Sequence, residues 1–125
     1  MSPDFFAMWV PAFVSTILSE VPIYALFLRG RMGLGNALAL GVALQMITHP
    51  LFWIAWDAEP MLFYAHYDLA VVVFELVIFL VEAAIVWAVL RRRRPWQHVP
   101  NVVLALLASL CANGVSLTIG LLSEH

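Results

Sequence analysis

Residues 69–90 read LAVVVFELVIFLVEAAIVWAVL, an apolar stretch in which Glu75 and Glu82 are the charged side chains. At about 1.5 Å per residue, a helix of this length spans roughly the 30 Å hydrocarbon core of a bilayer. A carboxylate in that core costs about 2.5–3.5 kcal/mol on insertion scales. The stretch therefore predicts a membrane helix whose two glutamates are compensated by something inside the protein.

Three further stretches have the same apolar character, residues 5–28, 34–56 and 102–122. Hydrophobic residues make up 64% of the chain and charged residues 11%, a balance that excludes an ordinary water-soluble domain. The intervening loops are short, so neighbouring helices should run antiparallel. The prediction is an all-α fold: one domain, residues 1–125, forming a four-helix transmembrane bundle.

The basic residues are all arginines, and they lie in two of the predicted loops. The sequence has them at Arg29 and Arg31, and at Arg91, Arg92, Arg93 and Arg94. By the positive-inside rule, both loops are expected in the cytoplasm and both termini on the other face. The run of four could also bind anionic lipid headgroups. The loop at 57–68 is aromatic, which predicts an interfacial belt or, alternatively, a lid.

Polar residues follow one stripe on each predicted helix. Their spacings of three, four or seven residues place them on single helical faces. Because lipid penalises an outward polar face, the four stripes should meet inside the bundle. The candidate ion- or proton-binding residues are Glu20, Gln45, His49, Glu75, Glu82, Asn113 and Ser116.

Depth divides these residues into two predicted layers. Counting about 1.5 Å per residue from the arginine loops places Glu20 and Glu82 roughly 12 Å deep. The same rise places His49 and Glu75 at roughly 22 Å. Two carboxylates at one depth cannot both stay ionised in a low dielectric, so the inner pair is predicted to share a proton.

Two prolines accompany the ionisable residues. Pro22 follows Glu20 closely, and Pro50 comes directly after His49. An internal proline kinks a helix and frees the carbonyl four residues earlier. Such carbonyls coordinate cations in some membrane proteins, which favours a role in ion binding. The alternative is a kink that serves packing alone.

Three functions fit this pattern. The favoured one is a transporter, channel or transporter subunit that binds or conducts protons or small cations. The first alternative is a non-catalytic scaffold or accessory subunit whose buried polar residues hold helices or a partner together. The second is a membrane metal-binding enzyme, with His49 and Glu75 as metal ligands.

Catalysis is the least favoured reading. The sequence has no Glu-x-x-His, His-Glu-x-x-His, Gly-x-Ser-x-Gly or Cys-x-x-Cys motif. We expect no cofactor beyond a bound cation and no nucleic-acid partner. The expected partners are the lipid bilayer and either a second copy of the chain or another membrane protein.

Overall fold

The computed structural model describes residues 3–123, apart from the side chains of Pro3, Leu62 and Phe63. This range folds into helices α1 (Pro3–Met32), α2 (Leu34–Ala58), α3 (Pro60–Ala65), α4 (Tyr67–Arg93) and α5 (His98–Ser123). Among them α1, α2, α4 and α5 are long and apolar enough to cross a membrane. The predicted all-helical class with four such helices is confirmed.

The long helices are connected by tight turns. Gly33 alone separates α1 from α2, with a φ of 84° that only glycine adopts at little cost. Its N–H donates to the carbonyl of Arg29 at 2.9 Å, which closes the last turn of α1. Between α4 and α5, the carboxamide of Asn101 donates to the carbonyl of Arg94 at 2.9 Å. These contacts lie where the chain leaves one long helix and enters the next.

A short helix interrupts the segment that the sequence suggested was a loop. Helix α3 lies between α2 and α4 and begins at Pro60. Proline suits the first helical position, because its fixed φ is already helical and its missing N–H is not needed there. A segment of six residues is too short for its hydrophobic periodicity to predict a helix.

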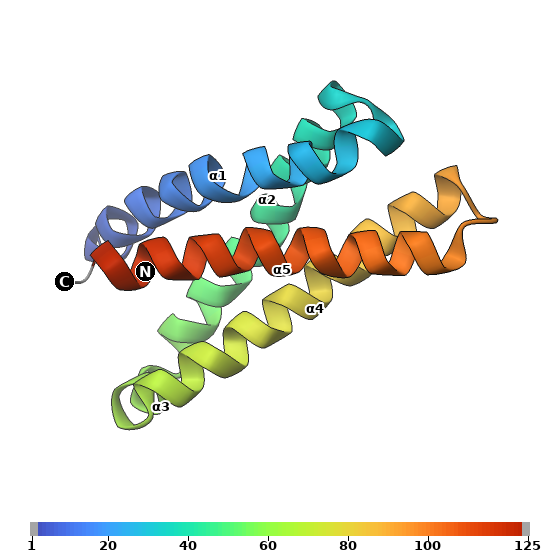
Figure 1. The fold of residues 1–125 in the computed structure, drawn as a ribbon. Coiled ribbons are helices and arrows are strands. Elements are labelled where there is room, and N and C mark those ends of the chain that lie inside the picture. The colour runs from blue at the N-terminus through green and yellow to red at the C-terminus, as the bar shows by residue number, and fades with distance from the viewer. Residues whose placement is uncertain (1–2, 124–125) are drawn as a thin grey trace.

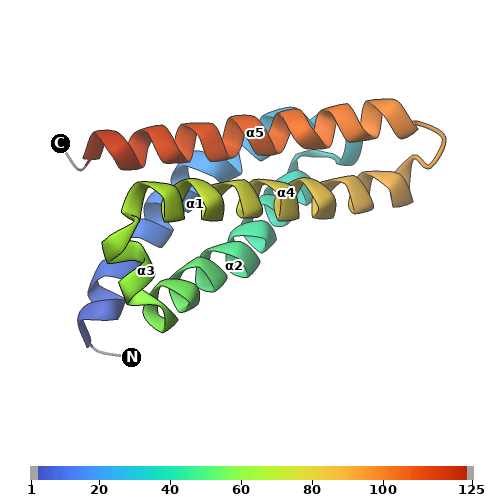
Figure 2. The same ribbon diagram turned by 90° about the horizontal axis from the view of Figure 1, so that it is seen from below.

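The two arginine-bearing turns lie at one end of the molecule, and α3 lies at the other (Figures 1 and 2). The guanidinium of Arg31 donates a hydrogen bond to the side-chain oxygen of Gln97, which joins the two turns directly. Arg91 lies 5.2 Å from the centre of the Trp87 ring, within reach of a cation–π contact. We call these two ends the arginine end and the α3 end.

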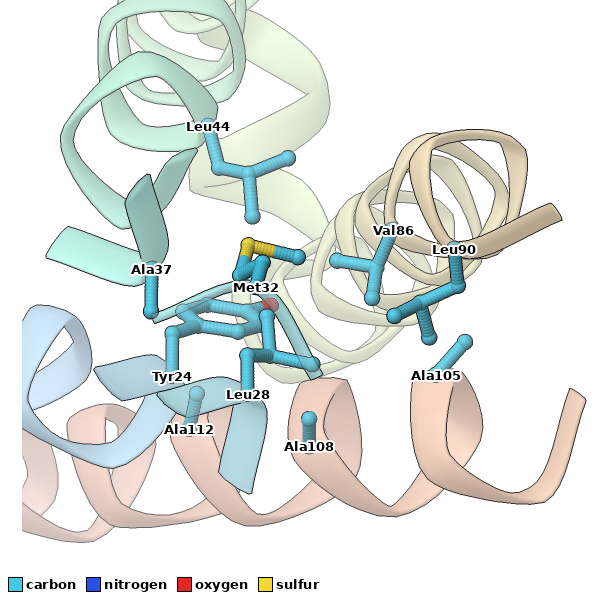
Figure 3. Packing of buried hydrophobic residues seen from close by; sticks show 10 residues of the cluster. All are labelled: Tyr24, Leu28, Met32, Ala37, Leu44, Val86, Leu90, Ala105, Ala108 and Ala112. Atoms are coloured by element: carbon cyan, nitrogen blue, oxygen red, sulfur yellow. The ribbon is translucent and has the colours of Figure 1, made fainter. Parts of the chain in front are cut away.

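The hydrophobic core fills the arginine end (Figure 3). It is built from buried apolar side chains of all four long helices, namely Tyr24, Leu28, Met32, Ala37, Leu44, Val86, Leu90, Ala105, Ala108 and Ala112. The three alanines on α5 are small enough to let other helices approach its backbone closely. This packing closes the bundle below the level of Glu82.

Burial stops toward the α3 end on α1, α2 and α5, whereas α4 still has Ala70 buried near that end. Within the described residues, α1 has no buried position before Glu20, α2 has none after Thr48, and α5 has none after Asn113. Side chains beyond these positions no longer fill the space between helices. The polar stripes therefore lie where a closed core gives way to an open region.

Candidate functional site

Glu82 lies at the centre of the polar region and is fully buried. Its carboxyl group accepts hydrogen bonds from the hydroxyl of Tyr24 at 2.5 Å, the hydroxyl of Thr48 at 2.8 Å and the amide of Asn113 at 2.8 Å. These donors come from α1, α2 and α5 respectively. One glutamate on α4 is thus bonded to all three other long helices, which compensates its burial.

Gln45 bridges the two inner glutamates. Its carboxamide nitrogen donates to Glu20 and, at 3.4 Å, to Glu82. A carboxamide has two hydrogens, so each glutamate can receive one. Glu20 and Gln45 are 3% and 1% exposed, which leaves both almost without water. We call the set formed by Glu20, Tyr24, Gln45, Thr48, Glu82 and Asn113 the glutamate cluster.

The contacts of the Thr48 hydroxyl bear on whether Glu82 carries a proton. Its oxygen lies 2.9 Å from the carbonyl of Leu44 and 2.8 Å from Glu82. A hydroxyl has one hydrogen, so it cannot donate to both. If Thr48 donates to Leu44, then Glu82 must carry a proton to complete the second contact. The geometry thus accommodates both a neutral and an ionised Glu82.

Gly41 sets how closely α1 and α2 approach. A Cβ atom at Gly41 would lie 3.3 Å from Val21 Cγ1 and 3.4 Å from Val21 Cα. A side chain at position 41 would therefore push the backbone of α2 away from that of α1. Gln45 follows one helical turn later on the same face, so this close approach brings its carboxamide to Glu20.

A cavity of about 730 Å³ lies above the cluster, toward the α3 end. Its polar floor includes Glu20, Gln45, Asn113 and Ser116, all of them candidate residues from the sequence. Glu75 lines its wall, two helical turns above Glu82. Glu82 is not part of the lining and lies enclosed beneath the floor. The cluster therefore has one glutamate facing the cavity and one behind it.

His49 lines the same cavity but is held mainly by aromatic rings. Its ring centre lies 5.2 Å from that of Phe13, 6.3 Å from Trp9 and 6.4 Å from Trp53. Among the described residues, its buried Nδ1 atom has no hydrogen-bond partner. The expected outer pair thus shares a cavity, while no hydrogen bond within the described residues joins His49 to Glu75.

The prolines make none of the hydrogen bonds that define the glutamate cluster. Helices α1 and α2 continue through Pro22 and Pro50. Pro22 is exposed, as are Leu18 (71%) and Met46 (59%), the residues whose carbonyls the prolines free. Pro50 is half-buried, and the hydrogen bonds between the cluster residues join side chains.

Two cluster residues were not among the sequence candidates. Tyr24 follows Glu20 by four residues, and Thr48 follows Gln45 by three, so both stand on the stripes already identified. Their positions on the stripes follow from spacing, but spacing alone does not show which hydroxyl reaches Glu82. Within the described part of the chain, no group of three or more His, Cys, Asp or Glu side chains could hold a metal ion.

Comparison of the chain with protein-family models, with curated proteins and with solved structures found no match. The function is therefore argued from the site itself.

Proposed function

We propose that this chain is an integral membrane protein, an antiparallel four-helix bundle with its arginine end in the cytoplasm and its glutamate cluster binding protons or small cations. The observation that carries the proposal is the Glu20–Gln45–Glu82 bridge, in which two buried carboxyl groups share one carboxamide. The cavity above Glu20 supplies a route to this bridge from the α3 end. Movement of the bound cation, alone or within an assembly, would make the protein a transporter or a transporter subunit.

Charge balance supports a cation at the bridge. Two like charges about 4 Å apart repel by about 4 kcal/mol at an effective dielectric constant of 20. The donors around Glu82 are hydroxyl and amide groups, which are neutral. The arginines lie in the distant turns and cannot neutralise the pair. A proton or a small cation shared by the two glutamates would remove the repulsion.

The closed core favours a binding site over an open pore in this conformation. Leu28, Leu44 and Val86 are fully buried on the arginine side of the cluster. A cation that reaches Glu20 from the cavity would meet this apolar packing next. Passage to the cytoplasm would require the core to open, as transporters with a fixed central site do.

A scaffold function is the second candidate, and one observation favours it. Glu82 bonds three other helices and lies outside the cavity, as expected of a residue that fixes helix positions. Interhelical hydrogen bonds in a membrane average only about 0.6 kcal/mol each, but several together can select one arrangement. The exposed apolar surface of the long helices would then contact lipid, a second copy or a partner membrane protein.

Thermal unfolding of the purified chain, over a range of pH values and small cations, separates the two functions. A cation site predicts that Glu20→Gln keeps the fold and loses most of the dependence on pH or on the cation. Glu59→Gln, at the exposed end of α2, is the matched control. An equal shift of the Glu20→Gln melting temperature under every condition would favour the scaffold instead.

A further inference from the structure

Three of the hydrogen-bond donors that line the cavity are already used inside the protein. Gln45 donates to the two inner glutamates, and Asn113 donates to Glu82 and to the carbonyl of Ser109. The hydroxyl of Thr16 donates to the carbonyl of Ala12 at 2.9 Å. Their hydrogens are therefore not offered to a molecule in the cavity.

The floor and wall instead offer acceptors. Glu20 and Glu75 present carboxyl groups to the cavity. Gln45 makes its hydrogen bonds to the two glutamates through its nitrogen, which leaves its carboxamide oxygen as an acceptor. No Lys or Arg lines the cavity within the described residues. A ligand that donates hydrogen bonds and carries positive charge would complement these acceptors.

The size and the upper wall indicate an organic ligand. A volume of about 730 Å³ lies within the range of small-molecule sites, roughly 300–1,000 Å³, and far exceeds what a bare ion fills. Phe52, Trp53 and Trp56 form an aromatic wall between the floor and the α3 end. Aromatic faces attract both apolar groups and cations.

We propose that the cavity binds a protonated organic amine, with its ammonium group against Glu20 and Gln45 and its apolar body against Phe52, Trp53 and Trp56. The proposal rests on the cation role of Glu20 given above and names the chemical class of the cation. The ammonium N–H groups would donate to the Glu20 carboxyl group and the Gln45 carboxamide oxygen, and the aromatic wall would exclude water from the rest of the ligand.

The test uses three probes of one shape on the purified full-length chain in detergent micelles. These are 4,4-diphenylbutylamine, its trimethylammonium analogue, which has no N–H donor, and the neutral 4,4-diphenylbutanol. Isothermal titration calorimetry measures each dissociation constant. The amine is expected to saturate one site and to bind at least about tenfold more tightly than either analogue, a difference of about 1.4 kcal/mol.

A substitution that fills the cavity tests the ligand site without changing any residue of the glutamate cluster. Gly120 on α5 lines the cavity, and a Cβ atom there would meet nothing within 4 Å. Gly120→Trp should therefore place an indole in the ligand's space and weaken amine binding by about tenfold or more. Gly114→Trp is the matched control, because Gly114 is equally open but does not line the cavity.

Equal affinities for the three probes, or unchanged amine binding in Gly120→Trp, would overturn the proposal. If the amine fails to bind while the wild-type melting temperature still depends on pH or a small cation through Glu20, the cation role survives and only its organic ligand is wrong. If both responses are absent, the cation role itself fails.

Discussion

The hydroxyl of Tyr24 donates a 2.5 Å hydrogen bond to the carboxyl group of Glu82 and so joins the last third of α1 to the middle of α4. Both side chains are fully buried. The contact lies at the boundary between the apolar core and the cavity, where it closes one side of the glutamate cluster. The Tyr24 side chain thus packs in the apolar core with its ring and contacts the candidate cation site with its hydroxyl group.

Tyr24→Phe tests this contact directly. The ring would keep its packing, but Glu82 would lose one donor. We expect a destabilisation of about 0.6 kcal/mol if Glu82 is neutral and about 1.5–3 kcal/mol if it is ionised. Reversible unfolding in mixed micelles measures the change. Tyr64→Phe, on the exposed surface of α3, should have no effect, and an equal loss in both variants would contradict a specific role for Tyr24.

Gly41→Leu should separate α1 from α2. The new side chain would collide with the backbone and side chain of Val21, so we expect a loss of about 1–3 kcal/mol. Movement of α2 would also carry Gln45 away from Glu20 and weaken any cation dependence. Gly114→Leu is the control, since the space around Gly114 is open. Wild-type stability in Gly41→Leu would show that the two helices can repack.

The stability of the wild type should fall as the pH rises. In the unfolded chain the carboxyl groups ionise freely, whereas in the fold a second ionised carboxylate would repel the first across Gln45. The unfolded state therefore releases protons that the folded state retains, and a single retained proton changes stability by about 1.4 kcal/mol per pH unit. Thermal unfolding at several pH values measures the slope.

Other titratable groups lie in this region, and their contributions to the pH dependence must be distinguished from that of the Glu20–Glu82 pair. They are Tyr24 on α1, His49 on α2 and Glu75 on α4, while Asn113 and Ser116 of α5 face the same region and do not titrate. Glu20→Gln should remove most of the pH slope, and His49→Phe should retain it. A slope that survives Glu20→Gln and disappears in His49→Phe would assign the dependence to the histidine.

Membrane orientation can be tested with the single cysteine replaced. In a Cys111→Ala background, Glu59→Cys and Trp96→Cys place one thiol at each end of the molecule, both at exposed positions. An impermeant maleimide should label residue 59 in intact cells and residue 96 only after permeabilisation. The reverse pattern would place the arginine end outside. The last residues of the chain lie outside the described range, so these internal positions are the suitable reporters.

Much of the architecture follows from local sequence. The apolar stretches and the arginine-bearing turns are properties of contiguous residues, and the structure has helices at all four stretches. The stripe on α4 also follows from spacing, because residues seven apart return to one face. Gln45 could not be assigned as a bridge in this way, since its role depends on the distance that Gly41 allows between two helices.

The sequence by itself determined that Glu20, Gln45, Glu82 and Asn113 lie on the polar faces of four apolar helices, because periodicity and hydropathy are local. The tertiary structure decided which atoms meet. It enclosed Glu82 among donors from three helices, left Glu20 and Glu75 facing a cavity, and surrounded His49 with aromatic rings. The physical reason is that helix crossing and side-chain volume, which no single segment specifies, set where the core closes and where space remains.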